Sequence, residues 1–401
     1  MPWTLAFVLT IFPLLAAVNF YVGRKLLDAL TRLRGWDRKR TRHVLAGILT
    51  YLNLLPVVFL IVYELRGRGI TGAFAGDNFT IDLLFTYPFW IALVISVQLL
   101  VLYVVADIVK FTILRFLQGP LEWWQKKEPV FVFLAFVFIV LYSAATIVKD
   151  TWTVRVVGRE VRLPPGFSSL DGFKIAQIAD VQGDGRTTPD KIRRFVKRIN
   201  ALHPDLALFA GDLVTSGTRH IDSAAAVLSE IRATYGTYAA VGDHDIFSHK
   251  TLAVGALRRN RVIVVEDSTL FLEVKGTRVA LSIVTYTYPQ RPTGEKLEEV
   301  ASELGNSYRI FLVHQPAETL VNFAQRKGYN LFIAGHTHGG GIAFGIPGLF
   351  LVAPASFETR YVSGFYDVGE LVVSVTNGLG FTLAPIRFHA PAEIAIIRLG
   401  R

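Results

Sequence analysis

Five short clusters of Asp, His and Gly follow one another along the chain from residue 180 onward. They are Asp180 with Gln182, Gly211-Asp212, Gly242-Asp243-His244-Asp245, His314, and Gly335-His336-Thr337-His338. Carboxylates and imidazoles that converge without cysteine suit divalent ions such as Mn, Fe, Zn or Mg. Two such ions a few ångströms apart form a clamp for in-line displacement at phosphorus. We therefore expect a two-metal centre that acts on phosphoesters.

Other chemistries lack their sequence signatures. The chain has no G-x-S-x-G nucleophile elbow, no Walker loop and no G-x-G-x-x-G that opens a helix. It has no cysteine, which excludes disulfides, thiolate zinc sites and a cysteine nucleophile. The net charge of +10 could suggest nucleic acid, but no recognition motif accompanies it. Much of the excess lies between apolar segments, so we expect no nucleic-acid partner.

Each cluster ends a short apolar run that reads as a buried strand. The runs are FKIAQIAD, DLALFAGD, TYAAVGDHD, RIFLVHQ and NLFIAGHTH. Helical stretches alternate with them, and one has Thr188 as its expected N-cap and Pro189 at its first helical position. This alternation predicts a layered α/β domain over residues 151–401. Ligands of such sheets bind outside the carboxyl ends of the strands, so the clusters should meet at one rim.

The first 150 residues have a different texture. Four apolar segments, each near the length that crosses a bilayer, run about Trp3–Val22, His43–Leu65, Leu83–Val109 and Val130–Val148. Hydrophobic residues make up 52% of the chain and charged residues only 18%, which is unusual for a soluble protein. We therefore expect a transmembrane region of about four helices over residues 1–150, and a multi-pass protein of the cell membrane.

Basic residues in the loops predict the orientation. The first loop, GRKLLDALTRLRGWDRKRTR, and the third, with Lys110, Arg115, Lys126 and Lys127, are basic, whereas the second carries only Arg66 and Arg68. Such loops stay in the cytoplasm. With four spans the domain after Val148 is then extracytoplasmic, and losing one span would reverse this. Part of the first loop, LLDALTRLRGW, could instead lie on the membrane as an amphipathic helix.

In order and spacing, the five clusters resemble the calcineurin-like metallophosphoesterase family. The family pattern is D-x-H, G-D, G-N-H-[DE], a lone H and G-H-x-H, and here it reads D-V-Q, G-D, G-D-H-D, H-Q-P and G-H-T-H. The closing segment, with NGLGFTLAPIRFHAPAEIAIIRL, is similar to the membrane-associated YkuE-type branch. The resemblance covers about Leu163 to Leu399. It implies a four-layered α-β-β-α sandwich and a metal-dependent phosphoric ester hydrolase.

The resemblance also implies a role for each cluster residue. Asp212 would bridge two metal ions. The first ion would be bound by Asp180, Gln182 and His338, and the second by Asp243, His314 and His336. His244 would protonate the leaving oxygen or stabilise its charge, and Asp245 would orient His244. Separately, Arg360 and Arg387 are candidates for a phosphate clamp, because Arg forms paired hydrogen bonds to phosphate. Structural ion pairs are an equal alternative for both.

Two ligand positions depart from the family pattern. Gln182 stands where the family has His, and Asp243 stands where it has Asn. The extra carboxylate makes a centre of two divalent ions and a hydroxide neutral, whereas the family pattern leaves one positive charge. More oxygen ligands should favour Mn or Fe, with Zn and Mg as alternatives. Asp184 could replace Gln182 as a ligand, although an ordinary turn role for Asp184 is favoured.

The sequence therefore indicates a membrane-anchored phosphoesterase. Its substrate would be a phosphodiester or phosphomonoester, with a lipid or envelope-related molecule as the expected class. One alternative is a nucleotide-sugar lipid pyrophosphatase of lipid A synthesis, a cytoplasmic reaction that conflicts with the expected orientation. Another is a degenerate, non-catalytic membrane scaffold, because two ligand positions are altered. A transporter is disfavoured, since the spans hold few ionisable residues apart from Asp107.

Overall fold

The structure, a computed structural model, describes residues 3–66, 76–116, 120–381 and 383–400. Its contacts divide the chain into two compact units. The helical unit contains residues 1–74 and 79–148, and the sheet unit contains residues 75–78 and 149–401. Arg68, from the predicted second loop, lies outside the described residues.

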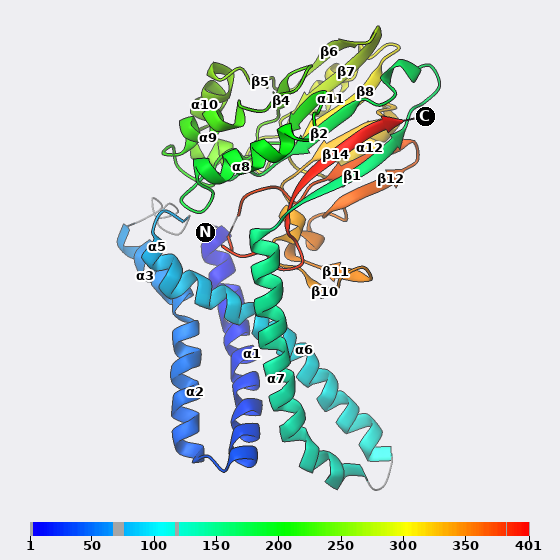
Figure 1. Cartoon of the computed structure of the whole chain (residues 1–401). Coiled ribbons are helices and arrows are strands. Elements are labelled where there is room, and N and C mark those ends of the chain that lie inside the picture. Colours follow the sequence, from blue (N-terminus) through cyan, green and yellow to red (C-terminus); the bar gives the residue numbers. More distant parts are fainter. Residues whose placement is uncertain (1–2, 67–75, 117–119, 382, 401) are drawn as a thin grey trace. The chain divides into compact units, whose positions relative to one another are not determined.

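The helical unit is built from long helices (Figure 1). They are α1 (Trp3–Arg34), α2 (Arg38–Leu52), α3 (Leu54–Arg66), α6 (Tyr87–Phe116) and α7 (Pro120–Trp152), with a short α5 (Phe79–Ile81) and a π-helix η2 (Asp82–Thr86) before α6. Two stretches are long and apolar enough to cross a membrane, Phe79–Thr112 and Trp123–Trp152. These two contain the third and fourth predicted spans.

The other two predicted spans have a different outcome. The second is divided between α2 and α3, which meet at 46° and count as a span only if the bent pair is one. Pro56 explains the break, because its ring cannot fit against the carbonyl of Leu52, four residues earlier, in a regular helix. The first span falls within α1, where several side chains lie outside the described residues. Two spans are therefore supported, or three with the bent pair, and the count of four stays a prediction.

Two acidic groups of the helical unit, those of Asp107 and Glu128, have basic partners. Lys25 of α1 pairs with Asp107 of α6, and it also lies 2.9 Å from Glu128 of α7. Lys110 lies 2.7 Å from Glu128, and the Tyr21 hydroxyl donates to Asp107 over 2.6 Å. These contacts join three helices, as expected for ionisable groups among apolar helices, which must pair with one another. Because these ionisable groups pair with one another, they do not support the transporter alternative.

The sheet unit contains two six-stranded sheets and a separate hairpin (Figure 1). In spatial order the first sheet is β1 (Val154–Arg162), β14 (Ala392–Gly400), β2 (Lys174–Ile178), β3 (Leu206–Phe209), β4 (Thr237–Ala239) and β5 (Ile263–Val264). The second is β12 (Gly364–Val368), β13 (Leu371–Val375), β9 (Leu331–Ala334), β8 (Tyr308–Val313), β7 (Thr277–Val284) and β6 (Ser268–Val274). The hairpin is β10 (Phe344–Ile346) and β11 (Phe350–Val352).

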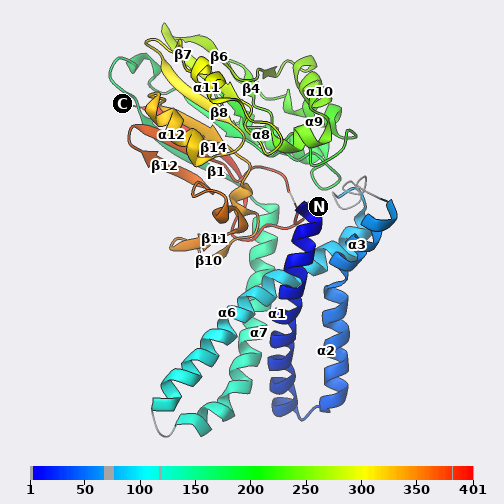
Figure 2. The same cartoon turned by 180° about the vertical axis from the view of Figure 1, so that it is seen from behind.

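Helices cover the outer face of each sheet (Figures 1 and 2). The first sheet carries α8 (Pro189–Asn200), α9 (Ile221–Leu228) and α10 (Asp243–Arg259), and the second carries α11 (Gly294–Val300) and α12 (Glu318–Arg326). Single 3₁₀ turns are η3 (Ser168–Leu170), η4 (His338–Gly340) and η5 (Pro354–Phe357). As expected, Thr188 caps α8, where it accepts a hydrogen bond from the main chain of Lys191.

Alternation along the central strands creates the layers. Leu206 and Leu208 of β3 are buried against the facing sheet, whereas Ala207 and Phe209 are buried under the helices. The second sheet repeats this, because Ile310 and Leu312 face inward and Phe311 faces its own helices. Successive side chains of a strand point to opposite faces, so a strand buried on both sides is apolar throughout. The unit is therefore a mixed α/β fold with two packed sheets.

Two local predictions were wrong in detail. By itself, the pattern of TWTVRVVGREVRLP predicts two strands or a hairpin, but the segment forms the single strand β1, parallel to β14 along its whole length. Gly158 sits inside this strand opposite Ile396 and makes no turn. Likewise, HIDSAAAVLSEIRATYG by itself predicts a helix closed by Gly236, but α9 ends at Leu228. In both cases contacts distant in sequence decide the boundary, and the local pattern cannot reveal them.

Candidate metal centre

Two groups of potential metal ligands lie at the carboxyl ends of the strands. One consists of Asp180, Asp212 and His338, and the other consists of Asp243, His314 and His336. Within each group the ligand atoms all lie within 4.8 Å of one another. Five strand ends supply them, those of β2, β3, β4, β8 and β9. The structure therefore brings together six of the seven predicted metal ligands in these two groups.

The backbone at these positions is unusual. Five of the predicted ligands have a positive φ, namely Asp180, Gln182, Asp212, His336 and His338. Non-glycine residues adopt this conformation rarely, and such residues cluster at functional sites. Close packing accompanies it, since a Cβ atom on Gly242 would lie 2.1 Å from Oδ1 of Asp212. The chain turns sharply after each strand, which directs the ligand side chains into one region.

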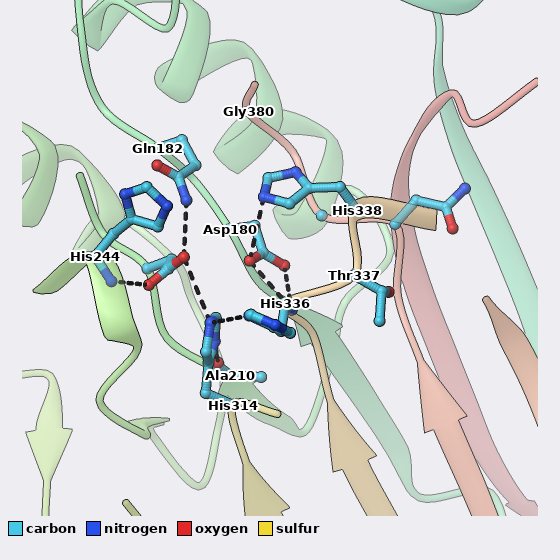
Figure 3. Close-up of polar contacts among 12 residues, drawn as sticks. Asp180, Gln182, Ala210, His244, His314, His336, Thr337, His338 and Gly380 are labelled. Atoms are coloured by element: carbon cyan, nitrogen blue, oxygen red, sulfur yellow. Dashed lines mark hydrogen bonds and ion pairs between the residues drawn. The ribbon is translucent and has the colours of Figure 1, made fainter. Parts of the chain in front are cut away.

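Asp212 connects the two groups. Its Oδ2 accepts a hydrogen bond from Nε2 of Gln182 over 2.8 Å and lies 3.4 Å from Nε2 of His314 (Figure 3). Its Oδ1 accepts a hydrogen bond from the main-chain N–H of His244 over 2.9 Å. In the second group, Nε2 of His314 lies 2.7 Å from Oδ1 of Asp243. One carboxylate thus reaches residues of both groups, as the bridging position requires.

Hydrogen bonds orient the imidazoles of the second group. Nδ1 of His314 lies 2.7 Å from the carbonyl of Ala210, which leaves Nε2 to face Asp243 and Asp212. Nδ1 of His336 lies 3.2 Å from Nε2 of His314 (Figure 3), and Nε2 of His336 lies 3.2 Å from Oε1 of Glu358. An imidazole that ligates a metal usually donates its other N–H to a carboxylate or a carbonyl. Both rings have this arrangement.

Sequence reasoning missed Glu358. It directly follows η5, twenty residues after His338, and belongs to none of the five clusters. Tyr288 also approaches, because its ring packs edge-on against His336 with centroids 5.3 Å apart. No motif or spacing in the sequence relates Glu358 to the site, because the hairpin β10–β11 lies between it and the last cluster.

Gln182 is buried beside the first group, and Asp184 is not part of that group. Oδ1 of Asp184 accepts main-chain hydrogen bonds from Arg186 and Thr187, and its Oδ2 accepts one from the hydroxyl of Thr215. Asp184 is therefore a turn residue whose oxygens are already engaged. Gln182 contacts Asp212, while its own Oε1 is buried with no hydrogen-bond partner among the described residues.

The predicted partnership between His244 and Asp245 was wrong. Asp245 accepts main-chain hydrogen bonds from Asp212 and Leu213 and from Gly242, over 2.8 to 3.0 Å. It therefore holds the loop that carries Asp212. His244 is oriented by the carbonyl of Thr215, which lies 2.5 Å from its Nδ1. The spacing suggested a contact between adjacent side chains, but α10 begins here and neighbouring residues of a helix point apart.

The two candidate phosphate-binding arginines have different settings. Arg387 is buried, and its guanidinium donates to the carbonyls of Asn377, Gly380 and Ala390 over 2.6 to 3.0 Å. These bonds hold the closing segment in place, so Arg387 does not have the setting of a phosphate clamp. Arg360 is exposed and donates to the hydroxyl of Tyr361. Its phosphate-binding role stays a prediction.

Burial and the crowding of charges perturb the titrating groups. Burial raises the pKa of Asp180 to about 7, and the charge of Asp212 acts in the same direction. Burial by itself would lower the pKa of His336, but hydrogen bonds to Asp243 and Glu358 outweigh it and raise the pKa to about 9. Three buried carboxylates, those of Asp180, Asp212 and Asp243, share this region. Such a cluster is stabilised by nearby cations that compensate its charge or by proton uptake.

The residues fit a pair of divalent ions. The donors are carboxylate oxygens and imidazole nitrogens, the set that Mn, Fe and Zn accept. Two buried polar atoms at the first group, Oε1 of Gln182 and Nδ1 of His338, have no hydrogen-bond partner among the described residues. Rotation of the Gln182 amide would turn its oxygen toward the carboxylates of Asp180 and Asp212. An ion bound near these carboxylates would then have the amide oxygen as a further ligand.

Comparisons with known proteins relate the chain to the metallophosphoesterases. Residues 173–340 match the family model for calcineurin-like phosphoesterases. An uncharacterized metallophosphoesterase of Campylobacter jejuni is 26% identical over 269 residues, which cover 66% of this chain and 67% of that protein. YkuE of Bacillus subtilis, also described as an uncharacterized metallophosphoesterase, is 29% identical over 245 residues, which cover 59% of this chain and 81% of YkuE.

A third relative is a Danio rerio protein named transmembrane protein with metallophosphoesterase domain. It is 25% identical over 282 residues, which cover 66% of this chain and 62% of that protein, so the match spans less than two thirds of its length. The family model, these relatives and the two ligand groups point the same way. The chain contains a calcineurin-like metallophosphoesterase domain and is a homologue of YkuE and of transmembrane metallophosphoesterase proteins.

Proposed function

We propose that this protein is a membrane-anchored phosphoesterase that uses two divalent metal ions. One observation carries the proposal: two groups of buried ligand atoms lie at neighbouring strand ends, and Asp212 reaches residues of both. In the proposed assignment Asp180, Gln182 and His338 hold the first ion. Asp243, His314 and His336 hold the second, and Asp212 bridges them.

Bound there, the ions would supply Lewis-acid activation of water and charge neutralisation at phosphorus. The other steps belong to this chain. His244 is the proposed general acid, because its Nδ1 is engaged by the Thr215 carbonyl and Nε2 remains to protonate the leaving oxygen. Asp245 contributes by fixing the main chain of Asp212, at a distance from the reacting atoms.

Manganese or iron is the proposed metal, with zinc and magnesium as alternatives. The proposed set contains carboxylates at Asp180, Asp212 and Asp243 and an amide at Gln182, so oxygen donors outnumber the three imidazoles. Harder ions prefer oxygen, whereas zinc favours nitrogen and sulfur. The additional negative charge of Asp243 also reduces the attraction of the centre for an anionic substrate.

The anchoring proposal rests on the apolar helices. Four spans over residues 1–150 would place the domain of residues 151–401 outside the cytoplasm. The substrate would be a phosphodiester or phosphomonoester, such as a lipid or envelope molecule that a domain tied to the bilayer can reach. A nucleotide-sugar lipid pyrophosphatase is the alternative within this class, and it requires the opposite orientation. A reporter fused to the C-terminus distinguishes the two, since only the alternative predicts a cytoplasmic signal.

The activity is tested with the full chain in detergent, loaded with Mn²⁺ and offered a soluble aryl phosphodiester and an aryl phosphomonoester. We expect turnover of at least one of them. The variant His244→Ala should lose it by roughly 10²–10⁴-fold, the usual contribution of a general acid, while it binds as much metal as the wild type. Unchanged turnover in His244→Ala contradicts the assigned role. Metal binding without any turnover in the wild type favours a non-catalytic scaffold.

A further inference from the structure

The segment between His338 and Glu358 is free of charge. Residues 339–357 read GGGIAFGIPGLFLVAPASF and contain no Asp, Glu, Lys, Arg or His. Large apolar side chains are nevertheless exposed there: 54% of Phe350, 73% of Leu349 and 91% of Phe357 are accessible. Isolated exposed apolar residues are ordinary on soluble proteins, but a contiguous group marks an interaction site.

The exposed residues are carried by the hairpin β10–β11. A turn at Pro347-Gly348 joins its strands, with a hydrogen bond from the N–H of Leu349 to the carbonyl of Ile346. Gly348 has a φ of 84°, which a type II turn requires at that position. Consecutive residues from Phe350 to Val352 are all exposed, so both faces of the ribbon lack a covering layer. A two-stranded hairpin of this kind is marginally stable in water.

The base of the hairpin is anchored beside the metal centre. Ile342 and Ala353 are buried at its two ends, and the N–H of Ala343 bonds to the carbonyl of Phe388. The hairpin leaves the site just after His338, and the chain returns to it at Glu358, which contacts His336. In both views of the molecule β10 and β11 project from the sheet unit, away from its two main sheets (Figures 1 and 2). A partner that binds the tip of the hairpin is therefore also placed near the candidate metal centre.

We propose that the hairpin β10–β11 and Phe357 form a lipid-contacting element that inserts into the surface of the bilayer. This inference rests on the proposed membrane anchoring and deepens it, because it identifies the substrate as one whose phosphate is held at the membrane surface. The candidate span Trp123–Trp152 ends two residues before β1 begins at Val154. The sheet unit is thus joined directly to an apolar helix, and a bilayer is the apolar phase within reach. A segment without charges also offers a charged protein surface no ion pairs.

The absence of cysteine permits a direct test on the full chain. Single cysteines replace Leu349 or Leu351 and carry an environment-sensitive fluorophore. The matched control is Leu252→Cys on α10, because Leu252 is 43% exposed and Leu351 is 41% exposed. In both views α10 lies at the other end of the sheet unit from the hairpin (Figures 1 and 2). Each variant is placed in phosphatidylcholine–phosphatidylglycerol nanodiscs with or without lipid that carries a nitroxide quencher near its headgroup.

We expect the nitroxide lipid to reduce emission from positions 349 and 351 and to leave position 252 unchanged. Equal emission with and without nitroxide at position 349 overturns the proposal, and so does equal quenching at position 252. A blue-shifted label at position 349 that nitroxide does not quench indicates cover by protein, which also overturns it. Turnover of a soluble aryl phosphodiester should survive Leu349→Ser. Loss of quenching and loss of turnover are therefore separate failures, the first of the lipid contact and the second of the phosphoesterase assignment.

Discussion

Nε2 of His336 lies 3.2 Å from Oε1 of Glu358, on the side of the ring opposite His314 and Asp243. The carboxylate fixes which nitrogen carries the proton and leaves Nδ1 to face the second ligand group. It also makes the imidazole a stronger donor. Glu358 is therefore a positioning residue for the proposed second ion.

We predict that Glu358→Gln weakens binding of the second ion by about 10–100-fold, the usual effect of removing a carboxylate behind a ligating imidazole. Titration of the metal-free protein with Mn²⁺ measures this. Glu370→Gln is the matched control, because Glu370 is exposed in the turn between β12 and β13. If both variants bind as the wild type does, Glu358 does not orient a ligand.

We predict that Gln182→His shifts the preference of the first ion toward zinc. An imidazole replaces an amide beside Asp212, which adds a nitrogen donor and restores the family pattern. Competition between Zn²⁺ and Mn²⁺ for the purified protein, followed by elemental analysis, measures the shift. An unchanged ratio of the two metals would show that residue 182 is not a ligand.

We predict that Asp245→Asn destabilises the sheet unit by about 2–4 kcal/mol, because the carboxylate accepts three main-chain hydrogen bonds and the amide can accept fewer. Thermal unfolding in detergent gives the change. Asp222→Asn, at an exposed residue of α9, should stay close to the wild type. A stable Asp245→Asn protein that had lost only turnover would instead restore the catalytic role first expected for Asp245.

Glu393 of β14 should make stability depend on pH. Burial raises its pKa to about 7 in the folded protein, above the ordinary value of 4.5. The folded state holds the proton of Glu393 more tightly than the unfolded state does. The contribution of Glu393 to stability is therefore greatest below pH 4.5 and is lost as the pH rises through 7. The loss is at most about 3 kcal/mol. Glu393→Gln should match the wild type near pH 5 and melt at a higher temperature near pH 8, and equal melting temperatures at pH 8 would refute this.

The local pattern was sufficient to predict where the candidate ligands lie. Apolar runs that end in Asp or His become strands whose carboxyl ends meet, so Asp180, Asp212 and His314 could be found without the structure. The spacing of residues in the sequence could not predict which groups orient these side chains. The carbonyls of Ala210 and Thr215 contact His314 and His244, and a main-chain carbonyl has no residue signature.

Contacts between distant parts of the chain account for the other differences. Glu358 reaches His336 because the chain returns to the site after the hairpin β10–β11. The charge of Arg387 suggested phosphate binding, but its guanidinium is buried and donates hydrogen bonds to carbonyls of the closing segment. β1 pairs with β14, which begins at Ala392, and no residue near β1 in the sequence indicates that partner. Each case depends on tertiary packing, which a pattern of adjacent residues cannot encode.

If two ions act together at this site, activity must depend on how many ions are bound. Bound metal and turnover are therefore measured together. The metal-free full chain is titrated with Mn²⁺, and bound metal and hydrolysis of an aryl phosphodiester are measured on the same samples. We expect activity to rise only as the second equivalent binds, and we expect Asp212→Asn to lose both the second equivalent and turnover. Full activity at one equivalent, or two bound equivalents and full turnover in Asp212→Asn, would contradict it.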